Sequence, residues 1–179
     1  EHGLLLIEDG ACAIGSSIED QYIGSHSDLV CFSLHPRKII TTGDGGMITT
    51  SNKDYADRLR LLRQHGMSVN DQVRHVSQKV IIEDYLELGY NFRMTDIQAA
   101  VGVEQLKKLD WIVTKRREIA HSYIDAFSDI PCLKLPIEPL GVVTNYQSFA
   151  VLLSDQSPIS RNELMQEMLY ELRMAMFVI

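Results

Sequence analysis

Short apolar runs bounded by Gly, Ser and Asp alternate with longer segments of helical periodicity along these 179 residues. The runs at 3–8, 28–33 and 46–50 have the length and the flanking turn residues of buried β-strands. A short hairpin is expected around residues 22–24. Open α/β sheets bind ligands at the carboxyl ends of their strands, so polar residues at these ends are candidates for a site.

The helical segments carry recognisable start signals. A helix over 53–64 follows two capping residues. Capping boxes of the form S/T-x-x-E/Q begin at Thr95 and Ser160, and each predicts a helix that starts directly after it. The first of these helices should run to about residue 109, and the apolar stripe over 111–128 predicts a long helix after it.

The remaining segments divide the chain. Three prolines mark a linker that starts at Pro131, and the apolar run 145–153 predicts a strand beyond it. We therefore expect two units, residues 1–130 and a smaller α+β unit over 131–179. Residues 67–88 should form a loop with one short strand or helix, because they are polar and weakly patterned, with Gln72, Arg74, His75, Gln78 and Lys79 among them.

Both ends of the chain lie close to expected strands. Residues 3–8 have no preceding helix to make the crossover that a parallel strand requires. Residues 177–179 stand where a further strand is expected to begin. The chain is therefore expected to be an internal piece of a longer protein.

Composition excludes several classes of function. The net charge of −7, from 24 acidic and 17 basic residues, argues against nucleic acid as a partner. No stretch reaches the roughly 18 to 20 apolar residues of a membrane span. The chain has three cysteines, Cys12, Cys31 and Cys132, and none of them has C-x-x-C spacing, which favours a reduced, cytoplasmic setting. These cysteines and His35 do not have the short spacings of a metal site.

The candidate chemistry lies at the expected strand ends. Asp9 ends the first strand, Ser33 ends the second, and Lys38 follows after Pro36, which turns the backbone around a corner. A carboxylate, a hydroxyl and a lysine are the groups needed to hold pyridoxal phosphate as a Schiff base. Single features of this region also have simpler structural interpretations. Asp9 could cap a turn, and Lys38 could be a solvated surface lysine. The Gly-rich residues 43–46, which follow Lys38, could form a tight hairpin turn.

Four segments, which follow one another along the chain in the same order as in a known family, carry a resemblance: Leu6–Gly15, Phe32–Lys38, Thr42–Met47 and Leu88–Met94. Together they resemble the DegT/DnrJ/EryC1/StrS family of sugar aminotransferases over residues 3–153. The resemblance implies fold type I, the aspartate-aminotransferase-like architecture, with a large α/β domain containing a mixed sheet and a smaller C-terminal domain. Residues 1–130 would be the C-terminal part of the large domain. The family works as homodimers with active sites at the subunit interface.

The resemblance also assigns roles to single residues. Lys38 becomes the lysine that forms the Schiff base, and Asp9 the partner of the pyridine nitrogen. Ser33 would bind the phosphate, and Asn91 would reach it from the other subunit. Cys12 stands where many members carry Gln or His near the phenolic oxygen of the cofactor.

These residues imply a transaminase that acts on a keto sugar, nucleotide-linked, with an amino-acid donor such as glutamate. Two alternatives stay open. Some members of the family are pyridoxal-phosphate-dependent sugar dehydratases, which carry His where Lys38 stands. A non-catalytic cofactor-binding or scaffold protein is the other alternative. No metal ion is expected.

Overall fold

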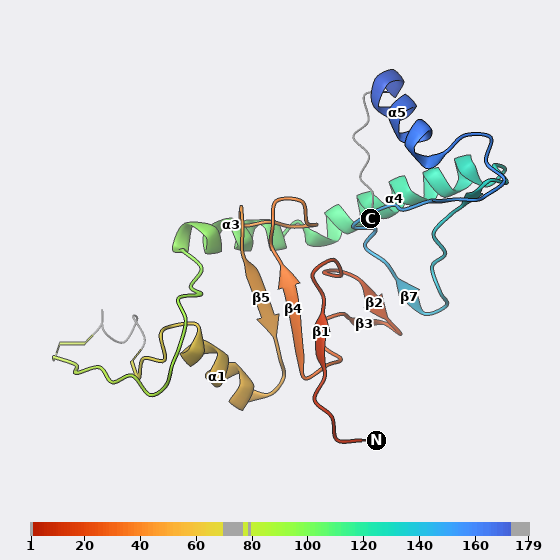
Figure 1. The fold of residues 1–179 in the computed structure, drawn as a ribbon. Helices are drawn as coiled ribbons and strands as arrows, with labels where there is room; N and C mark the ends of the chain where they lie inside the picture. Colours follow the sequence, from red (N-terminus) through yellow and green to blue (C-terminus); the bar gives the residue numbers. More distant parts are fainter. Residues whose placement is uncertain (1, 70–76, 79, 173–179) are drawn as a thin grey trace.

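A three-stranded mixed sheet organises the amino-terminal part of the chain (Figure 1). The computed structural model describes residues 2–69, 77–78 and 80–172. In the sheet, β4 (Leu29–Ser33) lies between β1 (Ile7–Asp9), which is parallel to it, and β5 (Gly46–Thr49), which is antiparallel. The three predicted strands are confirmed. The first is shorter than predicted because residues 3–6 lie outside the ladder with β4.

The parallel pairing of β1 and β4 places Asp9 and Ser33 at the same edge of the sheet, since Asp9 stands opposite Cys31. Gly10, directly after β1, allows the backbone to pass close to β4. A Cβ atom at this position would lie 2.8 Å from Cγ1 of Val30 and 3.1 Å from the Phe32 ring. A side chain there would therefore push the Asp9 strand end away from β4.

A second small sheet follows β1 and joins distant parts of the chain. The hairpin of β2 (Ser17–Ile18) and β3 (Gln21–Tyr22) turns at Glu19 and Asp20, whose φ angles are 48° and 64°. This turn precedes the predicted position around 22–24, because Glu and Asp occupy positive-φ positions that Asn and Gly usually signal. On its other side, β2 pairs with β7 (Val142–Val143).

Three helices begin where the capping signals place them: α1 (Lys53–Leu62), α3 (Asp96–Leu106) and α5 (Arg161–Leu172). The long helix α4 (Leu109–Phe127) has no side-chain cap and begins two residues before the predicted position, because α3 ends at Leu106 and not near 109. The Asn52 side chain caps α1, and both halves of the Thr95 capping box are present. At α5 the Ser160 hydroxyl accepts from the Glu163 N–H (3.2 Å), and the Glu163 carboxylate accepts from the Ser160 N–H (2.8 Å). The starts of α1, α3 and α5 are thus set by local side chains.

Residues 80–95 run in extended form with isolated bridges in place of the predicted short element. Met67 pairs with Tyr85 and Gln64 pairs with Asn91, on the chain that leaves α1. Gln78 is described and lies in a bend. The other polar residues of the predicted insertion lie outside the described residues: Gln72, Arg74, His75 and Lys79.

The strand predicted over 145–153 is wrong except at its end. Only β8 (Leu152–Leu153) pairs, with β6 (Leu133–Lys134). The backbone turns at Tyr146, where φ is 45°. Arg116 on α4 donates hydrogen bonds to the carbonyl groups of residues 146 and 147, so these groups are satisfied without a neighbouring strand. The division of the chain at residue 130 stays a prediction.

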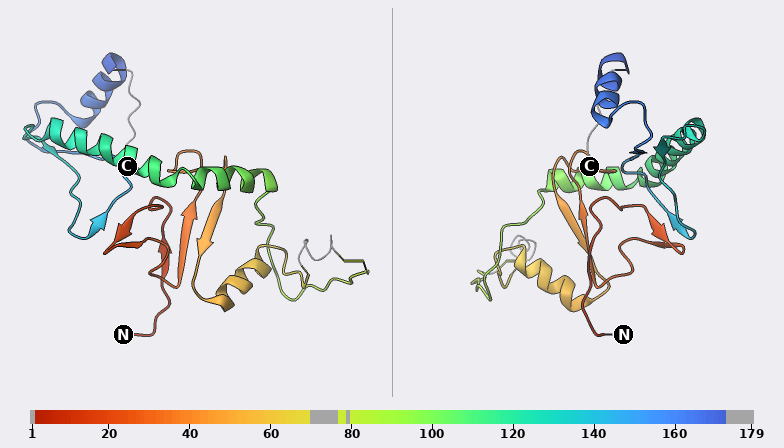
Figure 2. Two further views of the ribbon diagram at one scale, coloured as in Figure 1. Left: turned by 180° about the vertical axis from the view of Figure 1, so that it is seen from behind. Right: turned by 45° about the vertical axis from the view of Figure 1, so that its right-hand side comes forward.

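Helices α3 and α4 cross the carboxyl end of β4 and cover the loop between β4 and β5 (Figure 2). Three buried residues of this loop pack against Val113 of α4: Leu34, Ile39 and Ile40. Partly buried side chains complete this cluster: Ile14, Met94, Leu109 and Ile112. None of the helices in the described ranges is long and apolar enough to cross a bilayer.

Candidate functional site

The two strand ends present a carboxylate and a hydroxyl at one sheet edge. One carboxylate oxygen of Asp9 accepts from the Ala11 N–H (3.0 Å), so Asp9 does cap a turn, as the simpler interpretation proposed. The Ser33 hydroxyl oxygen accepts from the His35 N–H (3.3 Å). Asp9 is exposed and Ser33 is half-buried. Neither contact uses the whole hydrogen-bonding capacity of the side chain.

Lys38 turns back over this edge. The Lys38 N–H donates to the carbonyl of His35 (2.9 Å), which closes the turn that contains Pro36. Ile39 and Ile40, 6% and 2% exposed, anchor the backbone directly after it in the cluster below α4. Lys38 is therefore half-buried at the start of a fixed segment.

The Lys38 amine meets Cys12 from the loop that follows β1. Nζ of Lys38 donates to Sγ of Cys12 at 2.9 Å. Within the described residues, no carboxylate forms an ion pair with this amine. Asp9 and Ser33 thus stand at the carboxyl ends of β1 and β4, and Lys38 contacts Cys12 from the loop after β1. That these four residues form one cofactor site stays a prediction.

Asn91 lies apart from these four residues. It pairs with Gln64 beyond the end of α1, and its side-chain oxygen accepts from Nε of Arg93 (3.0 Å). Within the described residues, Asn91 has no hydrogen bond to Asp9, Cys12, Ser33 or Lys38. This position agrees with the prediction that Asn91 acts in another subunit, which stays a prediction.

The interpretation of 43–46 as a tight hairpin turn is wrong, because the longer loop over 34–45 joins β4 to β5. Residues 43–45 form the last part of this loop. Gly43 and Gly45 have φ angles of 85° and 151°, and the carbonyl of Gly45 accepts from the Leu34 N–H (2.9 Å). Gln98 on α3 donates to the carbonyl of Asp44 (3.0 Å). These residues lead the chain into β5 and fix the far end of the loop that carries Lys38.

Sequence reasoning missed two residues of the site, Asn145 and Gln147. The side-chain amide of Asn145 donates to the carbonyl groups of Cys12 (2.9 Å) and Ile14 (2.8 Å). That of Gln147 donates to the carbonyl of Arg37 (2.7 Å). The sequence signal for them is that both are polar residues within the apolar run 145–153. The alternation expected of a strand accounts for polar residues there, but it does not show which groups they bind.

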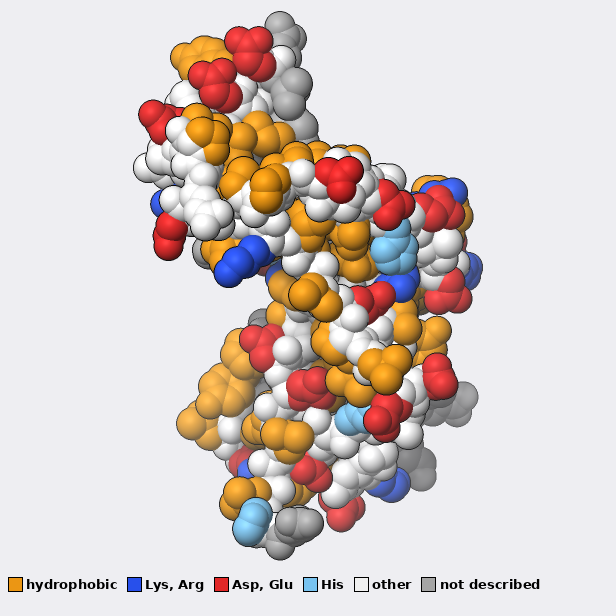
Figure 3. Space-filling model, turned by 90° about the vertical axis from the view of Figure 1, so that its right-hand side faces the viewer, with side chains coloured by type: hydrophobic (Ala, Val, Ile, Leu, Met, Phe, Trp, Pro, Cys, Tyr) orange, Lys and Arg blue, Asp and Glu red, His pale blue; other side chains and the backbone are white. Residues whose placement is uncertain are grey.

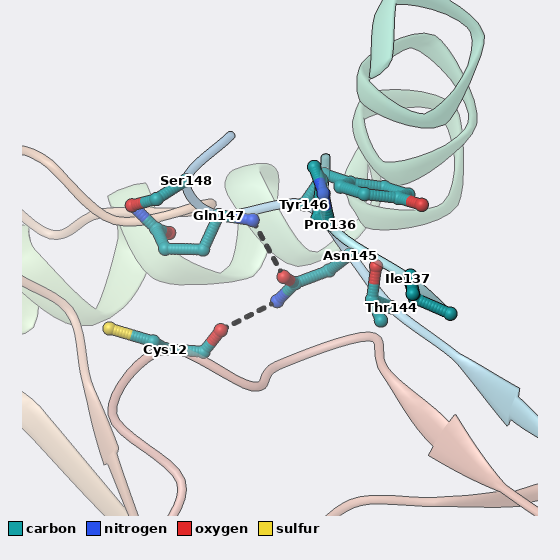
Figure 4. A pocket seen from close by; sticks show the side chains of 8 residues that line it. All are labelled: Cys12, Pro136, Ile137, Thr144, Asn145, Tyr146, Gln147 and Ser148. Atoms are coloured by element: carbon teal, nitrogen blue, oxygen red, sulfur yellow. Dashed lines mark hydrogen bonds between the residues drawn. The ribbon is translucent and has the colours of Figure 1, made fainter. Parts of the chain in front are cut away.

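The segment that carries these residues borders an open pocket of about 390 Å³ (Figure 4). The pocket is lined by Cys12, Pro136, Ile137, Thr144, Asn145, Tyr146, Gln147 and Ser148. Beside it, Arg117 binds the Glu138 carboxylate (2.5 Å) and the Thr144 carbonyl (2.7 Å). This hydrogen bond lowers the pKa of Glu138 and raises that of Arg117. The described part of the chain has no group of three or more His, Cys, Asp or Glu that fits a metal ion.

Comparison with known proteins decides the family. The model of the DegT/DnrJ/EryC1/StrS aminotransferase family matches residues 1–176. The chain belongs to this family. Its mixed α/β arrangement is that of fold-type I aminotransferases, as the resemblance predicted. The chain spans 32% to 44% of the length of the curated relatives compared with it.

One relative is the UDP-4-amino-4,6-dideoxy-N-acetyl-beta-L-altrosamine transaminase of Campylobacter jejuni serotype O:2. It is 38% identical over 131 residues, which are 73% of this chain and 33% of the relative. The structure of PseC from Helicobacter pylori, an aminotransferase involved in pseudoaminic acid biosynthesis, has a TM-score of 0.81 at 28% identity. The match covers 95% of this chain and 43% of PseC.

Two other solved structures bear on cofactor and reaction. A Streptococcus pneumoniae protein solved in its PLP form has a TM-score of 0.78 at 25% identity, covering 92% of this chain and 41% of that protein. GDP-4-keto-6-deoxymannose-3-dehydratase, with bound GDP-perosamine, has a TM-score of 0.79 at 25% identity, covering 93% and 45%. The fold is therefore shared by a transaminase and a dehydratase.

Proposed function

We propose that the protein containing this chain is a pyridoxal-phosphate-dependent transaminase. Its substrate is a keto sugar, nucleotide-linked, and its donor is an amino acid such as glutamate. The observation that carries this proposal is the half-buried Lys38 amine at the sheet edge that also presents Asp9 and Ser33. The names of the Campylobacter and Helicobacter relatives support the sugar substrate.

The residues present fit the cofactor. The Lys38 amine contacts the Cys12 thiol, and no carboxylate among the described residues forms an ion pair with it. The second carboxylate oxygen of Asp9 has no protein partner among them, which leaves it available to a ring N–H. Ser33 has a hydroxyl proton to donate, because its oxygen acts only as an acceptor toward His35. An amine, an anion and a donor thus meet at one edge.

When bound, pyridoxal phosphate supplies an electron-withdrawing ring that makes the neighbouring carbon acidic. The Asp9 carboxylate would keep the ring nitrogen protonated, since an anion favours the charged form of a nearby base. The Lys38 amine would carry a proton between the substrate carbon and the cofactor carbon. Ser33 and a second subunit's Asn91 would bind the phosphate, and Cys12 would lie near the phenolic oxygen.

A homodimer is part of this proposal. The extended 80–92 segment exposes apolar side chains almost fully, with Val80 at 94% and Ile82 at 90%. Main-chain bonds tie it to the end of α1, among them Tyr90 N–H to the Leu62 carbonyl (2.7 Å). A fixed apolar segment that is left in water indicates that a further surface covers it, and we propose that a second subunit supplies part of that surface. The three free cysteines agree with a reducing compartment, so we propose the cytoplasm.

Two alternatives are weaker. The structural match to a dehydratase keeps sugar dehydration within the range of this fold. The family's dehydratases are expected to carry His where this chain has Lys38, and this difference favours transamination. A non-catalytic scaffold would not need a lysine, an aspartate and a serine at one edge.

The decisive experiment uses borohydride on the full-length protein loaded with pyridoxal phosphate. Reduction should attach the cofactor covalently to Lys38, identified by mass spectrometry of the labelled peptide. Lys38→Ala should remove both the label and amino transfer from glutamate to a nucleotide-linked keto sugar. Lys53→Ala, on the exposed side of α1, is the matched control and should keep both. Label that persists on another lysine in the Lys38 variant would refute the assignment.

A further inference from the structure

We propose that Asn145 and Gln147 are positioning residues that fix the Cys12 loop and the Lys38 turn relative to each other. The inference rests on the proposed function, because it concerns the placement of the Lys38 amine. Both residues come from the segment after β7, far along the chain from the strand ends. Neither is hydrogen-bonded to the Lys38 amine or the Cys12 thiol; both bind the backbone that carries these groups.

Asn145 holds the loop after β1. It is 3% exposed, and its amide donates both of its protons, one to the Cys12 carbonyl and one to the Ile14 carbonyl. Its own backbone N–H donates to the hydroxyl of Ser16 (3.0 Å). Three hydrogen bonds from one buried residue thus fix the loop over residues 12–16. A buried amide with all donors paired is expensive to disturb.

Gln147 holds the other side. Its amide donates to the carbonyl of Arg37, which belongs to the peptide group that also contains the N–H of Lys38. That N–H donates to His35, so both polar atoms of the peptide before Lys38 are bound. The backbone N–H of Gln147 in turn donates to the Asn145 side-chain oxygen (2.8 Å; Figure 4). The two positioning residues are therefore coupled directly.

Helix α4 fixes this segment. Arg116 donates from Nε to the Tyr146 carbonyl (3.0 Å) and from Nη2 to the Gln147 carbonyl (2.8 Å). Tyr146 lies between the two positioning residues with a φ of 45°, which is uncommon for a large side chain. It is buried, with its ring edge-on to His121 of α4. The surrounding contacts thus hold a backbone conformation that this residue rarely adopts alone.

This arrangement has a chemical consequence. A reacting group displaced by about 1 Å loses roughly 100-fold in rate. The 2.9 Å separation of Nζ and Sγ joins two loops, both of which are bonded to the same three-residue segment. Loss of either side-chain donor should therefore let the loops move apart without removing any group that contacts the cofactor.

The test uses two near-isosteric variants of the full-length protein. Asn145→Asp keeps the oxygen that accepts from Gln147 but loses both donors, and Gln147→Glu loses the donor to Arg37. The control is Thr50→Val, which removes a hydroxyl bonded to the Asp28 carbonyl (2.6 Å) at the amino end of β4. All measurements are made well below the lowest melting temperature of the set, because loss of paired buried donors is itself expected to lower the stability of the two variants.

The first measurement is made without cofactor. Alkylation of Cys12 by iodoacetamide should become faster by roughly 3-fold or more in both variants, because the Lys38 amine that lies 2.9 Å from Sγ would move away and leave the thiol more accessible. The second measures borohydride trapping of pyridoxal phosphate on Lys38 and steady-state turnover. Trapping and kcat should each fall by roughly 10-fold or more, with a smaller change in the KM for the donor. Thr50→Val should match the wild type in all three.

The outcomes separate the two proposals. Wild-type protein that traps no cofactor on Lys38 would refute the proposed function, and Cys12 alkylation would still report on the loop. Alkylation at the wild-type rate in both variants would overturn the positioning role. Wild-type trapping and turnover in the variants, beside normal labelling of the wild type, would also overturn it.

Discussion

At the scale of single residues, Asp9 illustrates how a local role and a site role coexist. Its position at the end of a parallel strand followed from the apolar run before it, and one carboxylate oxygen does bind the turn at Ala11. Gly10 then lets the strand end lie against Val30 and Phe32. The turn orients the carboxylate at the sheet edge, so its capping contact supports the proposed role.

The charge of Asp9 is the first feature to test. Asp9→Asn keeps the size of the side chain but removes the anion that would stabilise a protonated ring nitrogen. Turnover of the full-length protein should fall by on the order of 100-fold, as for other groups that stabilise developing charge. The dissociation constant of pyridoxal phosphate should change much less, as measured by absorbance titration. Equal turnover in the two proteins would count against the role of Asp9.

At the scale of elements, the segment between β6 and β8 is held by charged side chains of α4. Arg116 binds its backbone at 146 and 147, and Arg117 binds Glu138 and the Thr144 carbonyl. Both partners of the Arg117–Glu138 pair are about one-fifth exposed. Such a shielded pair with additional backbone bonds contributes more to stability than an exposed pair on a helix surface.

The pH dependence of stability should report this pair. Arg117 lowers the pKa of Glu138 in the folded protein, so the contribution is present above the unfolded value of 4.5 and is lost as pH falls through the folded pKa. Glu138→Gln should therefore destabilise the full-length protein by about 1 to 3 kcal/mol at pH 7. The difference from wild type should shrink below about pH 4.5.

Denaturant titration at several pH values provides the measurement. The matched control is Glu104→Gln, which removes an exposed pair with Lys107 on α3 and should cost less than about 1 kcal/mol. A Glu138 variant that differs from wild type by the same amount at every pH would contradict the assigned cause.

At the scale of the whole molecule, the described residues leave much apolar surface in water. Leu4 and Leu5, before β1, are 83% and 69% exposed, and the 80–92 segment is similarly uncovered. Figure 3 shows hydrophobic side chains exposed over both the upper and the lower part of one face. The relatives are more than twice as long as this chain, so they have further residues available to cover such surfaces.

The 179-residue chain made alone should therefore self-associate and retain pyridoxal phosphate weakly. Exposed apolar strands and segments of this extent favour association. Light scattering after size-exclusion chromatography would measure the mass, and borohydride trapping would measure retained cofactor. A monodisperse monomer with stoichiometric cofactor on Lys38 would contradict this expectation.

The sequence by itself determined the features that depend on neighbouring residues. Helix starts at Thr95 and Ser160 were predicted because a capping box is closed by residues three positions apart. The sheet strands were predicted from short apolar runs, and the order of Asp9, Ser33 and Lys38 followed from the same local pattern. The family resemblance added roles for these residues, and the family model confirmed the membership on which they depend.

Only the tertiary structure decided which distant segments meet. Asn145 bonds to a residue 133 positions away and Gln147 to one 110 positions away, so no local pattern marks either contact. The pairing of β7 with β2 and the turn at Tyr146 are decided in the same way. The apolar run 145–153 favoured a strand, but Arg116 satisfied its carbonyl groups from α4 and Asn145 was buried against the first loop. Long-range hydrogen bonds thus outweighed a local preference for strand, because that preference is small and buried polar groups must be paired.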